Sequence, residues 1–326
     1  MKKDYHDNSW INENVWDKYG KDDEVGAAQE ITQDSVLAAI QLVKKGKIYD
    51  LETERFKGMP VWAGHTGFEL VTYASPKGRQ NMKDTNIDAS VNWYKEGEWL
   101  DVPTNAKEYH MGLNTEIMIS SMHVGTHMDA LSHFTTGDDN HFYNGFSGDE
   151  YCTNFGPGRC DIASTPPMVM RGVLLDMAGY KGVEHLPNNY IITAEDCEGC
   201  AKWEGVELRP GDAVMVRCAD AWPSDRCGDA GLGVSAARYL VEECGAILLG
   251  DDKACIDGFN ADGSTSVPEH PQPVHHYLLI QQGVHILEYV QLDELAADKQ
   301  YEFCFICNVS KVRGATGMFV RPIAIV

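Results

Sequence analysis

The sequence predicts an α/β fold in which a mixed β-sheet is covered by helices. Between residues 172 and 250, short apolar runs typical of buried strands alternate with segments that have helical patterning. Such alternation favours a sheet with helices packed on it. A chain of 326 residues, 43% of them hydrophobic, is also long enough to bury a large core without disulfide bonds.

Each expected element follows from a local pattern. Thr32 is a candidate N-cap for an amphipathic helix that stops at Gly46, and a strand is expected over residues 47–51. A partly alternating run over residues 114–122 predicts a strand that delivers His123 to its carboxyl end. Further strands are expected at 173–176, 213–216, 246–249 and 284–289, and helices at 193–203, 235–244 and 274–282.

No internal repeat, low-complexity tract or linker rich in proline or serine interrupts the chain. We therefore predict a single domain over residues 1–326, with residues 1–30 as an N-terminal extension. No run approaches the roughly 20 apolar residues that a membrane span requires, and the first residues lack the apolar run of a secretory signal. A cytoplasmic location is expected.

The chain is strongly acidic. It has 49 acidic against 27 basic side chains and a formal net charge of −22, which repels phosphate backbones and anionic membranes. We expect a small-molecule substrate as the partner, and neither nucleic acid nor a membrane. The charge does not require a cationic substrate, because a bound metal can reverse the local field.

Two Cys-X-X-Cys pairs stand out among the ten cysteines. Cys304 and Cys307 fall in a predicted strand, where an odd spacing points the two thiols to opposite faces and disfavours a shared metal. Cys197 and Cys200 fall in a predicted helix, where both share a face, so that a redox or metal role is geometrically possible. No second pair at zinc-site spacing lies near them, and buried free thiols are the favoured interpretation.

Four side chains that can bind a metal or transfer a proton fall within eleven residues: His123, His127, Asp129 and His133. Histidine is a frequent metal ligand, and a carboxylate two residues after a histidine can reach the same ion from extended backbone. Gly125 would let the chain turn so that the first two histidines converge, and Thr126 could donate a hydrogen bond behind them. The alternative is a chance cluster of surface or core histidines, but its density favours a metal centre.

A second group of candidate residues lies downstream: His270, His275, His276, His285 and Glu288. Glu288 is the only acidic residue in the apolar strand over residues 284–290, where an unpaired charge would be costly to bury. A metal or a histidine is its natural partner. The alternative is that Glu288 points to solvent from an edge strand.

The stretch from His123 to Phe134, HVGTHMDALSHF, resembles the signature of the metal-dependent cyclase family, which includes bacterial kynurenine formamidase and isatin hydrolase. The resemblance covers nearly the whole chain after about residue 10. It extends through WDKYG at 16–20, DDEVG at 22–26, YNG at 143–145, RGVLLD at 171–176, PGD at 210–212 and GATGMFVRPIA at 314–324.

The resemblance implies metal ligands at His123, His127 and Asp129, and a catalytic acid or base at His133. Leu131 stands where the family has a proline two residues after the aspartate, which bears on the shape of the pocket more than on the ligands.

The resemblance also implies residues outside the signature. A later histidine and a glutamate twelve residues on complete a one- or two-metal site in the family. His276 and Glu288 have this spacing, whereas His275 is one residue out of register. Trp62 lies where family members place an aromatic ring against the substrate; ordinary core packing is the alternative.

The implied fold is a mixed β/β/α arrangement of the swivelling, kynurenine formamidase-like type, with a barrel-like central sheet and covering helices. The family usually forms homodimers or homotetramers, binds one or two zinc or manganese ions, and cleaves aryl formamides, isatin-type lactams or lactones. We therefore expect a hydrolase that cleaves a small amide, lactam or lactone with metal-activated water, and either His133 or Glu288 as the proton acceptor.

Two alternatives remain. A serine or cysteine hydrolase is disfavoured because the chain has no Gly-X-Ser-X-Gly elbow. A non-catalytic metal-binding or interaction protein on the same scaffold is disfavoured because the implied ligands and His133 are all present.

Overall fold

The computed structural model describes residues 3–62, 64–74, 93–95, 98–100, 114–219 and 230–326. The chain divides into two compact units at points where the sequence shows no boundary. The larger unit contains Met1–Arg55, Met59–Thr66 and Ser121–Val326, and the smaller contains Phe56–Gly58 and Gly67–Ser120.

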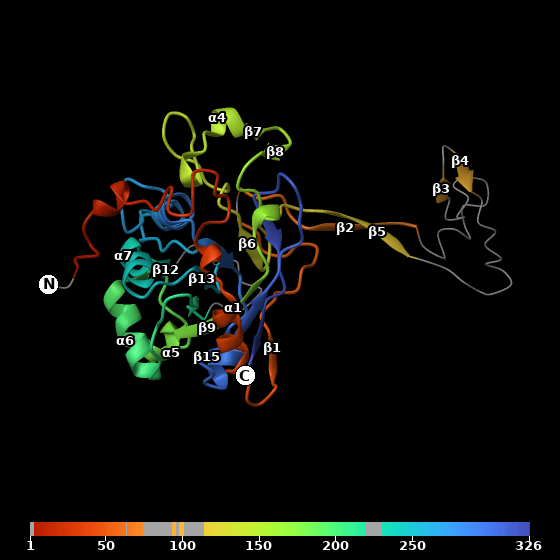
Figure 1. The fold of residues 1–326 in the computed structure, drawn as a ribbon. Coiled ribbons are helices and arrows are strands. Elements are labelled where there is room, and N and C mark those ends of the chain that lie inside the picture. The colour runs from red at the N-terminus through yellow and green to blue at the C-terminus, as the bar shows by residue number, and fades with distance from the viewer. Residues whose placement is uncertain (1–2, 63, 75–92, 96–97, 101–113, 220–229) are drawn as a thin grey trace. The chain divides into compact units, whose positions relative to one another are not determined.

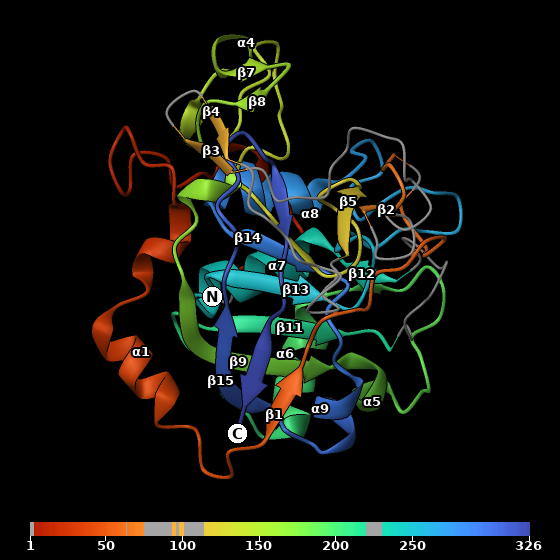
Figure 2. The same cartoon turned by 90° about the vertical axis from the view of Figure 1, so that its right-hand side faces the viewer.

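Nine of the described strands form one mixed sheet, which curls strongly within the larger unit (Figures 1 and 2). Their order is β1 (Ile48–Asp50), β17 (Ile323–Ile325), β15 (Glu302–Cys307), β9 (Met168–Asp176), β11 (Ala213–Arg217), β13 (Leu248–Asp251), β14 (His285–Glu288), β6 (His127–Asp129) and β16 (Gly317–Phe319). The four central strands from β9 to β14 run parallel, and the strands on either side pair antiparallel. The predicted α/β class with a barrel-like mixed sheet is confirmed.

The parallel strands are apolar because both of their faces are covered. Val173, Leu174 and Leu175 of β9 are fully buried, as are the first four residues of β11. Helices α5 (Met177–Lys181), α6 (Ala194–Glu204) and α7 (Val234–Arg238) gather on one side of the sheet (Figure 1).

Helix ends follow the expected chemistry. Thr193 caps α6 through a reciprocal pair of hydrogen bonds with Asp196, and Gly205 ends the helix with φ of 75°. Thr32 caps α1 (Gln33–Ile40), which stops before the predicted end at Gly46. The predicted helix over 235–244 is α7 continued by the π-helical turn η5 (Tyr239–Glu243).

The remaining elements of the larger unit are short. The helical ones are η1 (Ser9–Asn12), η2 (Gly26–Glu30), η3 (Tyr143–Gly145), α4 (Gly148–Tyr151), η4 (Ile162–Ser164), α8 (Pro273–His275), the π-helical η6 (His276–Gln282) and α9 (Asp293–Ala297). Two small strand pairs join β7 (Cys152–Thr153) to β8 (Gly156–Pro157) and β10 (Ile191–Ile192) to β12 (Gly231–Leu232).

The N-terminal segment packs on the larger unit. Trp10 is fully buried, the Val15 N–H donates to the Gln281 carbonyl at 2.9 Å, and the Ala27 N–H donates to the Gly283 carbonyl at 2.8 Å. Gly26 and Gly283 meet so closely that a Cβ at Gly26 would lie 2.2 Å from the Gly283 oxygen. This segment is therefore part of the fold that supports the π-helical turn η6.

The described residues of the smaller unit include two antiparallel strand pairs. One joins β2 (Glu69–Ala74) to β5 (Thr115–Ile119), the strand predicted over residues 114–122, and the other joins β3 (Trp93–Lys95) to β4 (Glu98–Leu100).

In the described part of the chain, no helix has the length and apolar character needed to cross a membrane. The described cysteines are free thiols. Cys197 and Cys200 are buried in α6, where burial raises the pKa of both thiols, and neither joins a potential metal cluster among the described residues.

Candidate metal centre

The segment from His123 to Asp129 is a tight loop that enters strand β6. Gly125 adopts φ of 59°, and a Cβ there would lie 2.9 Å from the Thr53 hydroxyl, so this position suits glycine. The turn brings the rings of His123 and His127 to a centroid distance of 5.1 Å. The predicted convergence of the two histidines is therefore present.

Hydrogen bonds hold this loop from behind. The Thr126 hydroxyl donates to the Tyr289 carbonyl at 2.6 Å, and the Thr126 N–H donates to the Thr53 hydroxyl at 2.7 Å. Arg55 donates to the carbonyls of Val124 and Thr126. Thr126 thus supports the loop backbone. In the described structure its side chain does not hydrogen-bond directly to a histidine ring.

Strand pairing brings Glu288 to the loop. Glu288 of β14 lies directly opposite His127 of β6, and a cross-strand pair shares one face of the sheet. His127 Nδ1 donates to the Gly125 carbonyl at 2.8 Å, which turns Nε2 toward two carboxylates. This nitrogen lies 3.4 Å from Asp129 Oδ1 and 3.4 Å from Glu288 Oε2.

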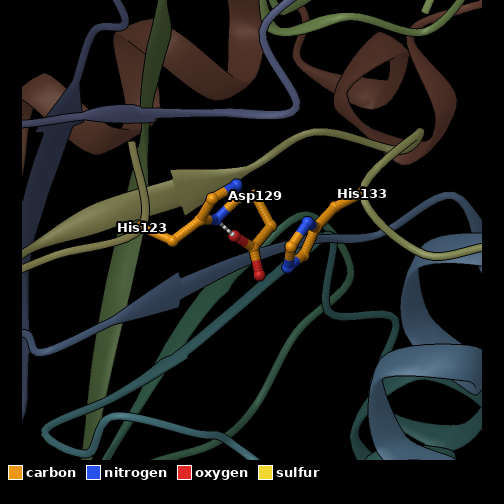
Figure 3. A group of neighbouring side chains, drawn as sticks. All are labelled: His123, Asp129 and His133. Atoms are coloured by element: carbon orange, nitrogen blue, oxygen red, sulfur yellow. Dashed lines mark hydrogen bonds and ion pairs between the residues drawn. The ribbon is translucent and has the colours of Figure 1, made fainter. Parts of the chain in front are cut away.

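His123 and His133 flank Asp129 from the other side (Figure 3). His123 Nδ1 lies 2.8 Å from Asp129 Oδ1, and the His133 ring stacks on the His123 ring at 3.9 Å between centroids. The predicted residues His123, His127, Asp129, His133 and Glu288 therefore come together.

His275, and not His276, completes this group. His275 Nε2 lies 3.3 Å from Glu288 Oε1 and 3.7 Å from Asp129 Oδ2. His276 Nδ1 instead lies 2.8 Å from His270 Nε2, and its ring packs edge-on against Trp10. Adjacent residues of a helical turn point about 100° apart, so only one of the two can face the cluster, and a spacing of twelve residues does not decide which one.

Burial and charge set the protonation of the group. Burial alone would lower the pKa of His127, but the carboxylates of Asp129 and Glu288 outweigh it and hold that pKa above its ordinary value. Burial would also lower the pKa of His275, but Asp257 and Glu288 outweigh it and hold that pKa well above its ordinary value. His133 differs, because burial and the neighbouring histidines hold its pKa well below the ordinary value.

The residues fit a divalent metal. The donor atoms of His127, Asp129 and Glu288 lie within 4.8 Å of one another, and so do those of His123, Asp129 and His133. With neutral imidazoles, the two carboxylates Asp129 and Glu288 leave a buried charge that a divalent cation balances. Asp129 Oδ2 is buried without a hydrogen-bond partner in the described structure, and a carboxylate oxygen in that position calls for a cation.

A cavity of about 160 Å³ opens beside these side chains. Its described lining combines aromatic and polar groups: Trp62, His65, His133, Phe134, Ala254, Cys255, Gln272, His275 and Glu288. Trp62 therefore lies in the wall of a cavity that also exposes His133 and Glu288.

Two supporting residues were missed from sequence. Arg55 lies in a segment of the sequence without a recognisable pattern. Its guanidinium carbon lies 4.3 Å from the centroid of the Phe319 ring. Asp257 hydrogen-bonds to His275 from a loop. The sequence signal for it is an acidic residue that directly follows the apolar stretch Ala254-Cys255-Ile256.

The chain belongs to the cyclase family. The family model described as "Putative cyclase" matches residues 49–258, which include the loop, His133 and Asp257. No curated protein matches the chain.

Solved structures share the fold. A structure described as a novel cyclase is 25% identical, with 96% of this chain and 100% of that chain covered and a TM-score of 0.77. Isatin hydrolase A from Labrenzia aggregata, bound to benzyl benzoate, is 20% identical over 85% of this chain and 93% of that chain, with a TM-score of 0.56. Isatin hydrolase A from Ralstonia solanacearum is 16% identical over 91% and 98%, with a TM-score of 0.57.

Proposed function

We propose that the protein is a metal-dependent hydrolase that cleaves a small amide, lactam or lactone. The observation that carries the proposal is the buried group of His123, His127, Asp129, His275 and Glu288, in which one carboxylate oxygen of Asp129 lacks a hydrogen-bond partner in the described structure. Isatin hydrolases that share the fold are consistent with it.

The metal would be held by His127, Asp129 and Glu288, with His123 and His275 as further candidate ligands beside them. When bound, a zinc or manganese ion supplies acidification of a water molecule and polarisation of a carbonyl group. The two histidines and one carboxylate of the loop suit either ion.

His133 is the better candidate for the proton acceptor. Burial keeps its pKa well below the ordinary value, so its ring is neutral near pH 7 and able to take a proton, and it lines the cavity. Glu288 is already engaged: its Oε1 accepts the Ile256 N–H at 2.9 Å, and both oxygens face histidine nitrogens. We therefore assign the proton transfer to His133.

The cavity favours a compact substrate with a flat ring. Trp62 and Phe134 supply aromatic walls, and the polar groups of Gln272 and the histidines lie around them. An aryl formamide, an isatin-type lactam and an unsaturated lactone are the substrates to screen.

The first experiment is the metal content per chain of the purified protein beside His127→Ala, with His141→Ala as the matched control. His141 lies outside the group and pairs with the exposed Asp139. We expect one or two equivalents of zinc or manganese in the wild type and in His141→Ala, loss of the metal in His127→Ala, and hydrolysis only where metal is bound. Absence of metal from the wild type after incubation with each ion would contradict the proposal.

A further inference from the structure

Asp257 is a fully buried carboxylate that serves one short segment of the chain. Its Oδ1 accepts the Val274 N–H at 2.7 Å. Its Oδ2 accepts the His275 N–H at 3.2 Å and lies 2.6 Å from His275 Nδ1. The three donors belong to two adjacent residues, so Asp257 binds both the backbone and the ring at this point.

The backbone contacts fix the helical turn. Helix α8 begins with Pro273, which has no N–H, so Val274 and His275 carry the first free N–H groups of the turn. Both of these groups donate to Asp257. This anchor sets the rotation of the turn and explains why His275 faces the cluster while His276 packs against Trp10.

The ring contact fixes which nitrogen is available. A carboxylate accepts and does not donate, so His275 Nδ1 carries the proton that it shares with Asp257. In the neutral ring the lone pair is then on Nε2, the atom that lies 3.3 Å from Glu288 Oε1 and 3.7 Å from Asp129 Oδ2. The carboxylate also makes the ring a stronger electron donor at Nε2.

We propose that Asp257 is a positioning residue of the metal centre, which holds His275 as a ligand with Nε2 directed at the ion shared with Asp129 and Glu288. This inference rests on the proposed function only for the presence of the ion. Asp257 is not part of the described lining of the cavity, and it reaches the centre through His275.

Asp257→Asn tests the proposal, because asparagine has the same shape but one side-chain oxygen fewer to accept the three N–H groups. We expect the affinity for zinc or manganese, measured by chelator competition, to fall about 10- to 100-fold. Asp196→Asn is the matched control, since Asp196 is also a buried carboxylate that caps a helix but lies in α6, outside the centre. Its metal affinity should stay within twofold of wild type.

A double-mutant cycle separates positioning from a general structural role. If Asp257 acts through His275, Asp257→Asn should have no further effect on metal affinity in a His275→Ala background. Equal losses in both backgrounds would overturn the proposal, and so would an unchanged affinity in the single variant.

The ¹H and ¹⁵N resonances of the histidine rings give a readout that needs neither metal nor substrate. The Nδ1 proton of His275 is assigned as the resonance that is missing from the spectrum of His275→Ala. We expect this resonance to lie far downfield in the wild type and to lose its downfield shift in Asp257→Asn. If the wild-type protein shows this proton but binds no metal, the proposed function is wrong, and Asp257 is still the residue that orients His275. A His275 ring without a proton on Nδ1 would overturn the positioning role itself.

Discussion

His133 lies beside the candidate ligands, yet its surroundings differ from theirs. It stacks on His123, lines the cavity, and has a pKa held well below the ordinary value by burial. His127, in contrast, points Nε2 at two carboxylates.

We therefore expect His133→Gln to retain the metal while kcat falls about 10²- to 10⁴-fold, the usual worth of a proton-transfer group. Metal analysis and steady-state kinetics on the same preparation check this outcome. A loss of metal in proportion to activity would instead make His133 a ligand, as its closeness to His123 and Asp129 allows.

Gly317 of β16 supports the centre by having no side chain. A Cβ at this position would lie 2.4 Å from His123 Cε1 and within 3.0 Å of both ring nitrogens. Because the ring must move to admit a methyl group, we expect Gly317→Ala to lower metal affinity at least about tenfold, as loss of a ligand-orienting contact does. Gly158→Ala is the control, since a Cβ there makes only an ordinary contact of 3.5 Å with the Tyr151 oxygen. Equal affinities in the two variants would show that His123 is not held in place by this contact.

The sequence identifies most of the candidate site at the residue scale, because the candidate ligands of the loop are close together in the chain. His123, His127, Asp129 and His133 share one short segment, and Glu288 is conspicuous as a charge in an apolar strand. The choice between His275 and His276 depends on the rotation of a helical turn, and Asp257 sets that rotation from 17 and 18 residues away. No local pattern contains this information.

Helices and strands were predictable from the sequence where a local pattern defines them. The residues at which they end were harder to predict. The buried parallel strands were expected from apolar runs, and helix α6 was expected over residues 193–203. The end of α1 and the π-helical turns depend on packing against other parts of the chain, which the sequence pattern does not report.

Glu204, at the end of α6, is expected to make the stability of the fold depend on pH. Burial raises the pKa of its carboxyl from 4.5 to about 8, and its Oε1 accepts the Asp176 N–H at 2.6 Å. Between these two pKa values the folded state binds more protons than the unfolded state, so this contribution to stability is complete below about pH 4.5 and is lost as the pH rises through 8.

Glu204→Gln keeps the acceptor and removes the charge. We expect this variant to unfold at a higher temperature than the wild type at pH 8.5, with a smaller difference at pH 6 and the smallest at pH 5. Thermal unfolding across this range checks it, with the exposed Glu207→Gln as the control. A difference that is the same at every pH would show that Glu204 is ionised in the fold throughout.

The division into two units appears only at the scale of the whole molecule. The strand pair β2–β5 of the smaller unit exposes about half of the surface of Leu70, Val71 and Ile117. The partly alternating pattern over residues 114–122 predicted β5, but it did not predict that β5 pairs with β2 in a two-stranded sheet of its own. The family resemblance, by contrast, predicted that sheet correctly because its motifs extend along the chain.

The metal is expected to act on the stability of the whole molecule because its candidate ligands come from separate elements. His127 and Asp129 lie on β6, Glu288 on β14 and His275 at the end of α8. Without an ion, the buried carboxylates of Asp129 and Glu288 rely on His127 and His275 for charge balance, in a chain whose net charge of −22 already resists compaction.

An ion that binds only the folded state at 100 times its Kd should stabilise it by about 2.7 kcal/mol, which corresponds to several degrees in Tm. Thermal unfolding with zinc or manganese, and again after chelation, measures this gain. Mg²⁺ at the same ionic strength is the control, because it screens the net charge equally but prefers oxygen ligands over imidazole. His127→Ala should lose the response and His141→Ala should keep it. An equal rise in Tm with Mg²⁺ would mean that charge screening, and not binding at this centre, stabilises the fold.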